Sequence, residues 1–144
     1  MCTTIEAVLT HRILISTSNR PKFFFGTASL TGKLTGARGC TRQYDSYFEY
    51  ERDLGRGVVA AFLGEQRLSI DGKRVLDIGC GEGGVLAGLA ERYSFHGLGI
   101  DYDEEMVRRA KKIPNCSIVH GDFYSHSFSD KYDFILIRDA LEHC

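Results

Sequence analysis

The sequence predicts an α/β protein with an open, doubly wound parallel sheet. Two observations predict it: strand-like and helix-like segments alternate from residue 74 onward, and a glycine cluster lies at the first junction between a strand and a helix. Strands that alternate with helices form parallel sheets covered on both faces, and right-handed crossovers are the default. A chain of 144 residues provides one such domain and hardly a second.

The composition is typical of a soluble globular protein, with 26% charged residues, 43% hydrophobic residues and two prolines. The formal net charge of −1 argues against binding nucleic acid by bulk charge. No apolar run approaches the ~18 residues of a membrane span, and the first residues lack an export signal, so we expect a cytoplasmic protein. A metal site or a disulfide framework is not expected, because the five cysteines are widely spaced: Cys2, Cys40, Cys80, Cys116 and Cys144.

Residues 1–42 differ from the rest of the chain. They are rich in serine and threonine and hold six basic residues against one acidic residue, whereas residues 43–144 hold twelve basic and eighteen acidic residues. We interpret 1–42 as a leader of unknown structure, either disordered or an organelle-targeting segment. Residues 12–17 and 23–30 are candidate short strands, although glycines interrupt this region.

The periodicity of apolar residues predicts each element of the region 43–144 in turn. From Tyr44 to Leu63 they recur at steps of three and four, which predicts one amphipathic helix, or two that break near Gly55 and Gly57. An Asp-Gly turn pair then precedes the first buried strand. The predicted strands are 74–78, 96–100, 117–120 and 132–138, and the predicted helices between them are 85–93 and 104–112.

The glycine cluster after the first strand predicts a ligand site. Glycine allows positive φ angles in the turn and lets a ligand approach backbone N–H groups. The stretch fits two patterns: a dinucleotide fingerprint through Gly79, Gly81 and Gly84, and an Asp-x-Gly-x-Gly-x-Gly pattern, which consists of Asp77, Gly79, Gly81 and Gly83.

Charge favours the second pattern. No lysine or arginine lies between Arg74 and Arg92, whereas Asp77, Glu82 and Glu91 do. A pyrophosphate about 4 Å from Asp77 would meet a repulsion of roughly 4 kcal/mol per charge pair at an effective dielectric constant near 20. A ligand with an ammonium and a sulfonium group would instead be attracted.

Acidic residues also follow the next two strands. Asp101 is placed to accept hydrogen bonds from both hydroxyl groups of a ribose, with capping of the following helix by Asp101 or Asp103 as the alternative. Tyr102 is either a platform for a purine or an ordinary surface aromatic. Asp122 is placed to accept from an exocyclic amino group while Phe123 provides an apolar wall, as adenine requires.

Four segments, VLDIGCGEGG, GLGIDYDEEM, VHGDFY and YDFILIRDALEHC, resemble in this order the class I S-adenosylmethionine-dependent methyltransferases, especially those that act on small molecules. The resemblance implies a Rossmann-like sheet and S-adenosylmethionine as the cofactor. It makes 43–144 the cofactor-binding part of a methyltransferase domain, with a small-molecule methyl acceptor. The implied cofactor-binding residues are Asp77, Gly79, Cys80, Gly81, Gly83, Asp101, Tyr102, Asp122, Phe123 and Asp139.

The resemblance also suggests roles near the reacting atoms. Asp139 is expected to contact the methionine end of the cofactor through its carbonyl or its side chain. Glu142 and His143 are conceivable bases, although packing or surface roles are favoured, and no catalytic residue is assigned. The helix before the first strand closes over the cofactor in similar enzymes, so Tyr44 or Tyr47 forms such a lid or packs on the sheet.

The sequence departs from this family where the fourth parallel strand ends. Three further strands of the family's sheet are missing, and the apolar run 134–137 would leave an unpaired hydrophobic edge. We therefore expect the 144 residues alone to be poorly stable or inactive. Two rival interpretations stay open, an NAD(P)-binding oxidoreductase and a domain that binds the cofactor without turnover, and the acceptor and the oligomeric state are not predicted.

Overall fold

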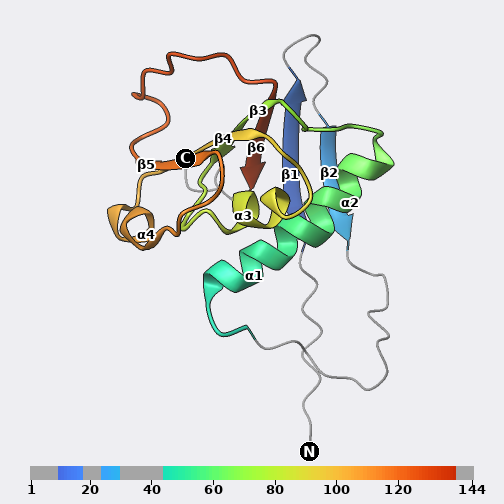
Figure 1. Cartoon of the computed structure of the whole chain (residues 1–144), viewed down its shortest axis with the longest axis horizontal. Helices are drawn as coiled ribbons and strands as arrows, with labels where there is room; N and C mark the ends of the chain where they lie inside the picture. Colours follow the sequence, from blue (N-terminus) through green and yellow to red (C-terminus); the bar gives the residue numbers. More distant parts are fainter. Residues whose placement is uncertain (1–9, 18–23, 30–43, 139–144) are drawn as a thin grey trace, which may run out of the picture.

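The computed structural model describes residues 10–17, 24–29 and 44–138. In these ranges six strands form one sheet in the order β2-β1-β6-β3-β4-β5 (Figure 1). The four strands β6, β3, β4 and β5 are parallel, whereas β1 and β2 pair antiparallel. The strand bounds are Thr10–Thr17 (β1), Phe24–Ser29 (β2), Arg74–Ile78 (β3), His96–Asp101 (β4), Cys116–His120 (β5) and Phe134–Arg138 (β6).

The helices begin and end within a few residues of their predicted positions. They are α1 (Tyr47–Leu54), the π-helical turn η1 (Gly55–Val59), α2 (Ala60–Glu65), α3 (Gly84–Ala90) and α4 (Glu104–Arg109). The first three follow one another directly, so Gly55 and Gly57 widen the helix into a π turn and do not break it. Ser46 caps the start of α1, since its side chain accepts a hydrogen bond from the Glu49 N–H at 3.3 Å.

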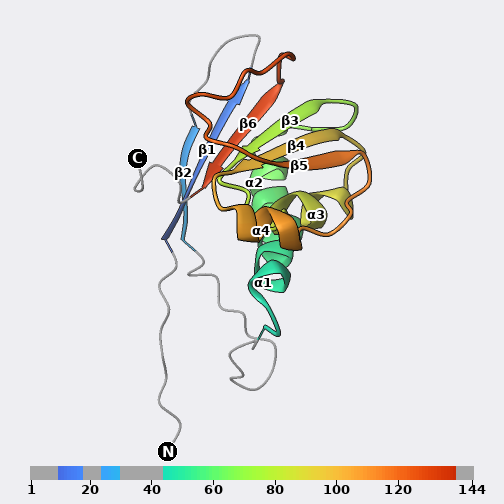
Figure 2. The ribbon, with the colours of Figure 1, turned by 90° about the vertical axis from the view of Figure 1, so that its left-hand side faces the viewer.

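The two faces of the sheet are covered differently. Val75 on β3 faces a core with Leu63, Leu86 and Leu89 of the helices, and Figure 2 shows the helices gathered on this side of the sheet. Leu76 faces the other way, into a second cluster that Phe128 and Tyr132 cover. Successive right-handed crossovers in one direction place α3 and α4 on one face, and the return from β5 to β6 uses the other. That return, segment 121–133, contains no helix.

The outer edge of β6 is paired, so the predicted unpaired edge was wrong. Strand β1 runs antiparallel to β6, from Ile13 opposite Arg138 to Thr17 opposite Phe134, and β2 in turn pairs with β1. The candidate strands of the region 1–42 therefore form a β-hairpin beside the fourth parallel strand. Its backbone provides the hydrogen-bonding groups that the edge of β6 would otherwise lack.

Candidate functional site

The order of the parallel strands places a site at the carboxyl end of β3. From β3 the chain crosses to β4 and then to β5, whereas β6 lies on the opposite side of β3. The strand order thus reverses between β3 and β6, and ligands of open α/β sheets bind outside the carboxyl ends of the strands at such a point. The glycine loop, which we define as residues 79–84, follows β3 at this place.

The backbone of the glycine loop explains its composition. Gly79, Gly81 and Gly83 have φ angles of 73°, 54° and 83°, a region that side chains disfavour. The Gly79 N–H donates to the carbonyl of Ile100 at 2.9 Å, which folds the loop over the end of β4. The positive φ angles expected from the sequence are present at all three positions.

Gly81 is where three elements meet. Its N–H donates to Asp101 Oδ2 at the end of β4, at 2.7 Å. A Cβ atom at Gly81 would lie 3.5 Å from Glu51 Oε2 and 4.0 Å from Tyr47 Cε1, both on α1. The loop is therefore enclosed by β4 on one side and by α1 on the other.

Carboxylates gather around this loop. Asp77 is 3% exposed and Glu51 is 1% exposed. Burial raises the pKa of the Cys80 thiol well above its ordinary value, and three nearby carboxylates raise it further, those of Asp77, Asp101 and Glu51. The segment 75–91 itself contains no lysine or arginine, so no basic residue faces these carboxylates from within the loop or its flanking residues.

Cys80 contributes its backbone to the loop and its side chain to the core. The side chain is 2% exposed. A Cβ atom at Gly99 of β4 would lie 2.7 Å from Cys80 Sγ, so the sulfur packs against β4. With its pKa raised, the buried thiol stays protonated near neutral pH and is no nucleophile.

Asp101 joins the loop to β4 and does not cap α4. Its Oδ1 accepts from the Asp103 N–H at 2.9 Å, in addition to the bond from Gly81. Asp103 is the cap, since its Oδ1 accepts from the Glu105 N–H at 2.9 Å and the Met106 N–H at 3.2 Å. Each carboxylate oxygen of Asp101 has a further lone pair, so the side chain retains the capacity to accept from two hydroxyl groups.

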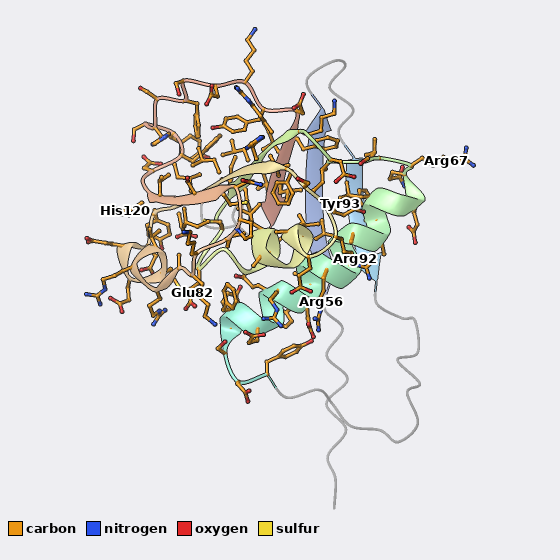
Figure 3. All side chains as sticks on the ribbon, in the orientation of Figure 1. Arg56, Arg67, Glu82, Arg92, Tyr93 and His120 are labelled. Atoms are coloured by element: carbon orange, nitrogen blue, oxygen red, sulfur yellow. The ribbon has the colours of Figure 1, made fainter. Side chains whose placement is uncertain are left out.

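The aromatic residue after Asp101 is open to a ligand. Tyr102 is 77% exposed. Its carbonyl oxygen lies 3.0 Å from Nε2 of His120, at the end of β5, where Figure 3 labels this histidine. The position of Tyr102 is thus set by its backbone while the ring remains exposed.

Asp122 and Phe123 lie at the same edge of the sheet. The Gly121 N–H donates to the carbonyl of Asp101 at 2.9 Å, which brings the ends of β4 and β5 together. Asp122 Oδ1 accepts from the Tyr124 N–H at 3.0 Å, so its carboxylate also stabilises a local turn. Phe123 is 37% exposed and contacts Phe128, with ring centroids 5.8 Å apart.

The structure places the two tyrosines of the lid hypothesis at the start of α1. Tyr44 is 39% exposed and Tyr47 is 51% exposed, so neither is buried against the sheet. Both rings contact Tyr50, at centroid distances of 5.4 and 5.9 Å. The remaining predicted residues of this region, Asp139, Glu142 and His143, lie outside the described residues.

The sequence reasoning missed Glu51 and its proximity to the loop. Its signal was present: Glu51 is three residues after Phe48 and three before Leu54, in the middle of the apolar stripe of α1. A second contact near the loop is the ion pair between Glu82 Oε1 and Arg109 Nε of α4, at 3.1 Å; Figure 3 labels Glu82 near this helix. It holds α4 against the loop from outside.

Two further findings concern the described residues. Among them, no group of three or more His, Cys, Asp or Glu side chains is arranged to hold a metal ion. The same part of the chain contains no helix that is long and apolar enough to cross a membrane.

The comparison with known proteins agrees with this geometry. Residues 75–144 match the protein family described as "Methyltransferase domain". This part of the chain belongs to the methyltransferase domain family. The match begins in β3 and includes the glycine loop and the ends of β4 and β5, and the family recognised from the sequence is confirmed.

The chain is also similar in sequence to named methyltransferases. The chain is 32% identical over 126 residues to N-methyltransferase 4 of Papaver somniferum, an alignment that covers 78% of this chain and 35% of the relative. It is also 32% identical over 117 residues to phosphoethanolamine N-methyltransferase 1 of Arabidopsis thaliana, over 70% of this chain and 24% of the relative. The chain thus spans about a quarter to a third of the length of these relatives.

Solved structures show the same fold. The plantazolicin methyltransferase BpumL, solved in complex with S-adenosylhomocysteine, has a TM-score of 0.50 and 26% identity, over 63% of this chain and 36% of that one. A protein of Methanococcus maripaludis, provisionally named an S-adenosyl-L-methionine-dependent methyltransferase, has a TM-score of 0.53 and 17% identity, over 74% of this chain and 57% of that one. The predicted Rossmann-like fold class is confirmed.

Proposed function

We propose that this methyltransferase domain binds S-adenosylmethionine across the glycine loop and transfers its methyl group to a small-molecule nucleophile. One observation carries the proposal: a loop of positive-φ glycines, which contains no basic residue and lies beside the carboxylates of Asp77, Asp101 and Glu51, is placed where the strand order reverses. Such a loop favours a cationic ligand over a phosphorylated one, because each phosphate charge about 4 Å from a carboxylate would cost roughly 4 kcal/mol. This charge pattern also disfavours the NAD(P)-binding alternative.

The residues of the site fit the parts of this cofactor. The glycine loop gives its amino-acid end access to backbone N–H groups, and Asp77 adds negative charge next to its ammonium group. Asp101 has lone pairs for the two ribose hydroxyls. The exposed ring of Tyr102 and the wall formed by Phe123 flank the adenine, whose amino group faces Asp122.

The chain's part in the reaction is mainly to position and shield. When bound, the sulfonium group supplies a methyl group that is already activated for in-line attack. The enclosure of the glycine loop between α1 and β4 holds the amino-acid end and excludes water there. No side chain is assigned as a base, and Cys80 is excluded from that role by its raised pKa.

The names of the relatives support a small amine as the acceptor. The poppy and Arabidopsis relatives are both named N-methyltransferases, and the second is named for phosphoethanolamine. We extend this to the present chain as part of the proposal, with an amine nitrogen as the methyl-accepting atom.

Calorimetric titration of the full chain with S-adenosylhomocysteine and with NAD tests the proposal. We expect saturable binding of the first and none of the second; the reverse result would overturn the assignment in favour of an oxidoreductase. Methyl transfer is then measured with radiolabelled S-adenosylmethionine and a panel of small amines. Binding with no transfer to any of them would overturn the catalytic part and leave a cofactor-binding domain.

A further inference from the structure

The buried face of α1 carries one acidic residue, Glu51, between Phe48 and Leu54. All three side chains are buried, and Glu51 is only 1% exposed. A carboxylate away from water is costly unless positive charge or hydrogen bonds compensate for its lost hydration. Glu51 therefore places a carboxylate within the packed, otherwise apolar face of α1.

The packing of α1 against α3 fixes where Glu51 lies. A Cβ atom at Gly84 would lie 2.4 Å from the Cβ of Glu51, and one at Gly88 would lie 2.0 Å from the carbonyl oxygen of Arg52. The two helices are therefore in backbone contact, closer than side chains would permit. The Cβ atom of Glu51 is therefore held directly over Gly84, the first residue of α3.

From this position the carboxylate faces the glycine loop. Glu51 Oε2 lies 3.5 Å from the place that a Cβ atom of Gly81 would take. The N–H of the same glycine is bonded to Asp101, which the proposed function assigns to the ribose. Glu51 therefore approaches from α1 the same stretch of loop that the cofactor would cover.

The chemistry of the carboxylate distinguishes between the two cationic groups of the cofactor. An ammonium group has three N–H donors for carboxylate oxygens, whereas a sulfonium group has none. The sulfonium methyl group must also be open to the acceptor. The carboxylate of Glu51 is buried beneath α1, so a sulfonium group placed next to it would have its methyl group turned away from the acceptor. The ammonium group is thus the partner that suits Glu51.

We propose that Glu51 is a cofactor-binding residue of α1, which binds the ammonium group at the amino-acid end of S-adenosylmethionine together with Asp77. The inference rests on the proposed function and deepens it. It makes α1, a helix that precedes the matched family residues, a functional part of the site.

The experiment that tests this proposal compares two ligands that differ at the amino-acid end. S-adenosylhomocysteine carries the ammonium group, whereas 5′-methylthioadenosine has the same adenosine and sulfur and lacks the amino-acid end. Calorimetry on the full chain measures both affinities for the wild type, for Glu51→Gln and for the control Glu49→Gln. Glu49 is on the same helix, and its carboxylate pairs with Arg52 at the surface.

We expect Glu51→Gln to weaken binding of S-adenosylhomocysteine by about 10- to 100-fold, the range for a hydrogen bond between charged groups. Binding of 5′-methylthioadenosine should change less than about two-fold, and Glu49→Gln should affect neither ligand. Equal weakening of both ligands would overturn the inference and make Glu51 a support of the fold, and so would no change for either.

A second variant covers the case in which Glu51→Gln does not fold. Glu51→Asp keeps the charge but withdraws it by one methylene, and it should weaken S-adenosylhomocysteine alone; a loss shared by both ligands contradicts the inference. If the wild type binds 5′-methylthioadenosine and S-adenosylhomocysteine equally well, the inference falls while the proposed function stands. If the wild type binds neither, the proposed function itself falls.

Discussion

At the end of β4, the carboxylate of Asp101 accepts hydrogen bonds from two backbone N–H groups, those of Gly81 and Asp103. It thereby stabilises the loop before any ligand arrives. The remaining lone pairs point to a second role toward a ribose. The two roles are separable by experiment, because the first affects the stability of the fold and the second affects only binding.

Asp101→Asn should therefore weaken S-adenosylhomocysteine binding by about 10- to 100-fold, since a hydrogen bond to a charged group is worth about 1.5–3 kcal/mol. The amide oxygen still accepts from one of the two backbone N–H groups, but the other loses its acceptor, so the unfolding free energy should also fall, by about 1–3 kcal/mol. Calorimetry gives the first quantity and urea unfolding the second. Asp130→Asn is the control, because Asp130 pairs with Arg74 at the amino end of β3, the opposite edge of the sheet.

Cys80 gives a prediction about reactivity. Because its pKa is raised in the folded state, the native thiol stays protonated through pH 9, whereas the unfolded thiol ionises above about pH 8.5. Iodoacetamide should leave Cys80 unmodified in native protein between pH 7 and 9 and modify it in urea, as peptide mass spectrometry would show. Rapid labelling of the native protein would contradict the buried placement.

The raised pKa of the Cys80 thiol also determines how the stability of the fold changes with pH. A group whose folded pKa is raised contributes stability that is lost as the pH rises above the unfolded value, so Cys80 weakens the fold only under alkaline conditions. Cys80→Ala, which keeps the loop backbone, should leave the affinity for S-adenosylhomocysteine within about two-fold of the wild type.

At the level of elements, the contact between α1 and α3 positions the site. A Cβ atom at Gly88 would lie 2.0 Å from the carbonyl oxygen of Arg52 and 2.7 Å from the backbone nitrogen of Arg56. Both neighbours are backbone atoms, which cannot rotate away. Gly55 makes a similar approach in η1, where its Cβ would lie 2.3 Å from the carbonyl oxygen of Val85.

Gly88→Ala should accordingly destabilise the protein by about 1–3 kcal/mol, the usual cost of overpacking, and lower ligand affinity as α1 shifts. Gly64→Ala is the matched control: it is also a helical glycine, with no atom within 4 Å of the added Cβ. That variant should gain about 0.5–1 kcal/mol, because alanine favours helices. Urea unfolding of both variants checks the opposite signs, and equal effects would contradict the close helix contact.

Local patterns predicted most of the elements. The strand at 74–78 was predicted at its observed bounds, because a short apolar run bounded by turn residues and glycines has the length of a strand and is too short for a typical helix. The π turn at Gly55–Val59 was not predicted; in it Gly55 packs against the backbone of Val85, a residue distant in the sequence. The ends of α3 and α4 were each placed three residues too far along the chain.

In the site, too, features that follow from local spacing were predicted and features that depend on distant contacts were not. The place of Asp77, Gly81 and Asp101 at one edge of the sheet was predicted from their spacing along successive strands, while their roles in binding stay predictions. The turn bonds of Asp122 and the proximity of Glu51 to the loop were not predicted, because both depend on contacts that no spacing reveals. An acidic residue within an apolar helical stripe was the usable signal for Glu51.

For the whole molecule, the pairing of β1 with β6 changes the expected stability. The sequence predicted an exposed apolar edge, and the structure instead places an antiparallel hairpin there. Such pairing joins segments more than a hundred residues apart, so neither local propensity nor spacing predicts it. The expectation that the chain is poorly stable lost its main physical reason.

The hairpin can be tested through the backbone of β1, which has neighbours on both sides. Leu14 lies opposite Phe25 in β2 and Ile137 in β6, so its N–H points to one of two paired strands and has a hydrogen-bonding ladder on whichever side it faces. Leu14→Pro removes that donor, and the lost bond should cost about 1–3 kcal/mol and expose the β6 edge to aggregation. Leu14→Ala, which keeps the N–H, is the control for the side chain. Thermal unfolding followed with light scattering should show the proline variant unfolding several degrees below the alanine variant and aggregating at lower concentration. Identical transitions for the two would mean that β1 does not protect β6, and the edge would again be open, as the sequence alone predicted.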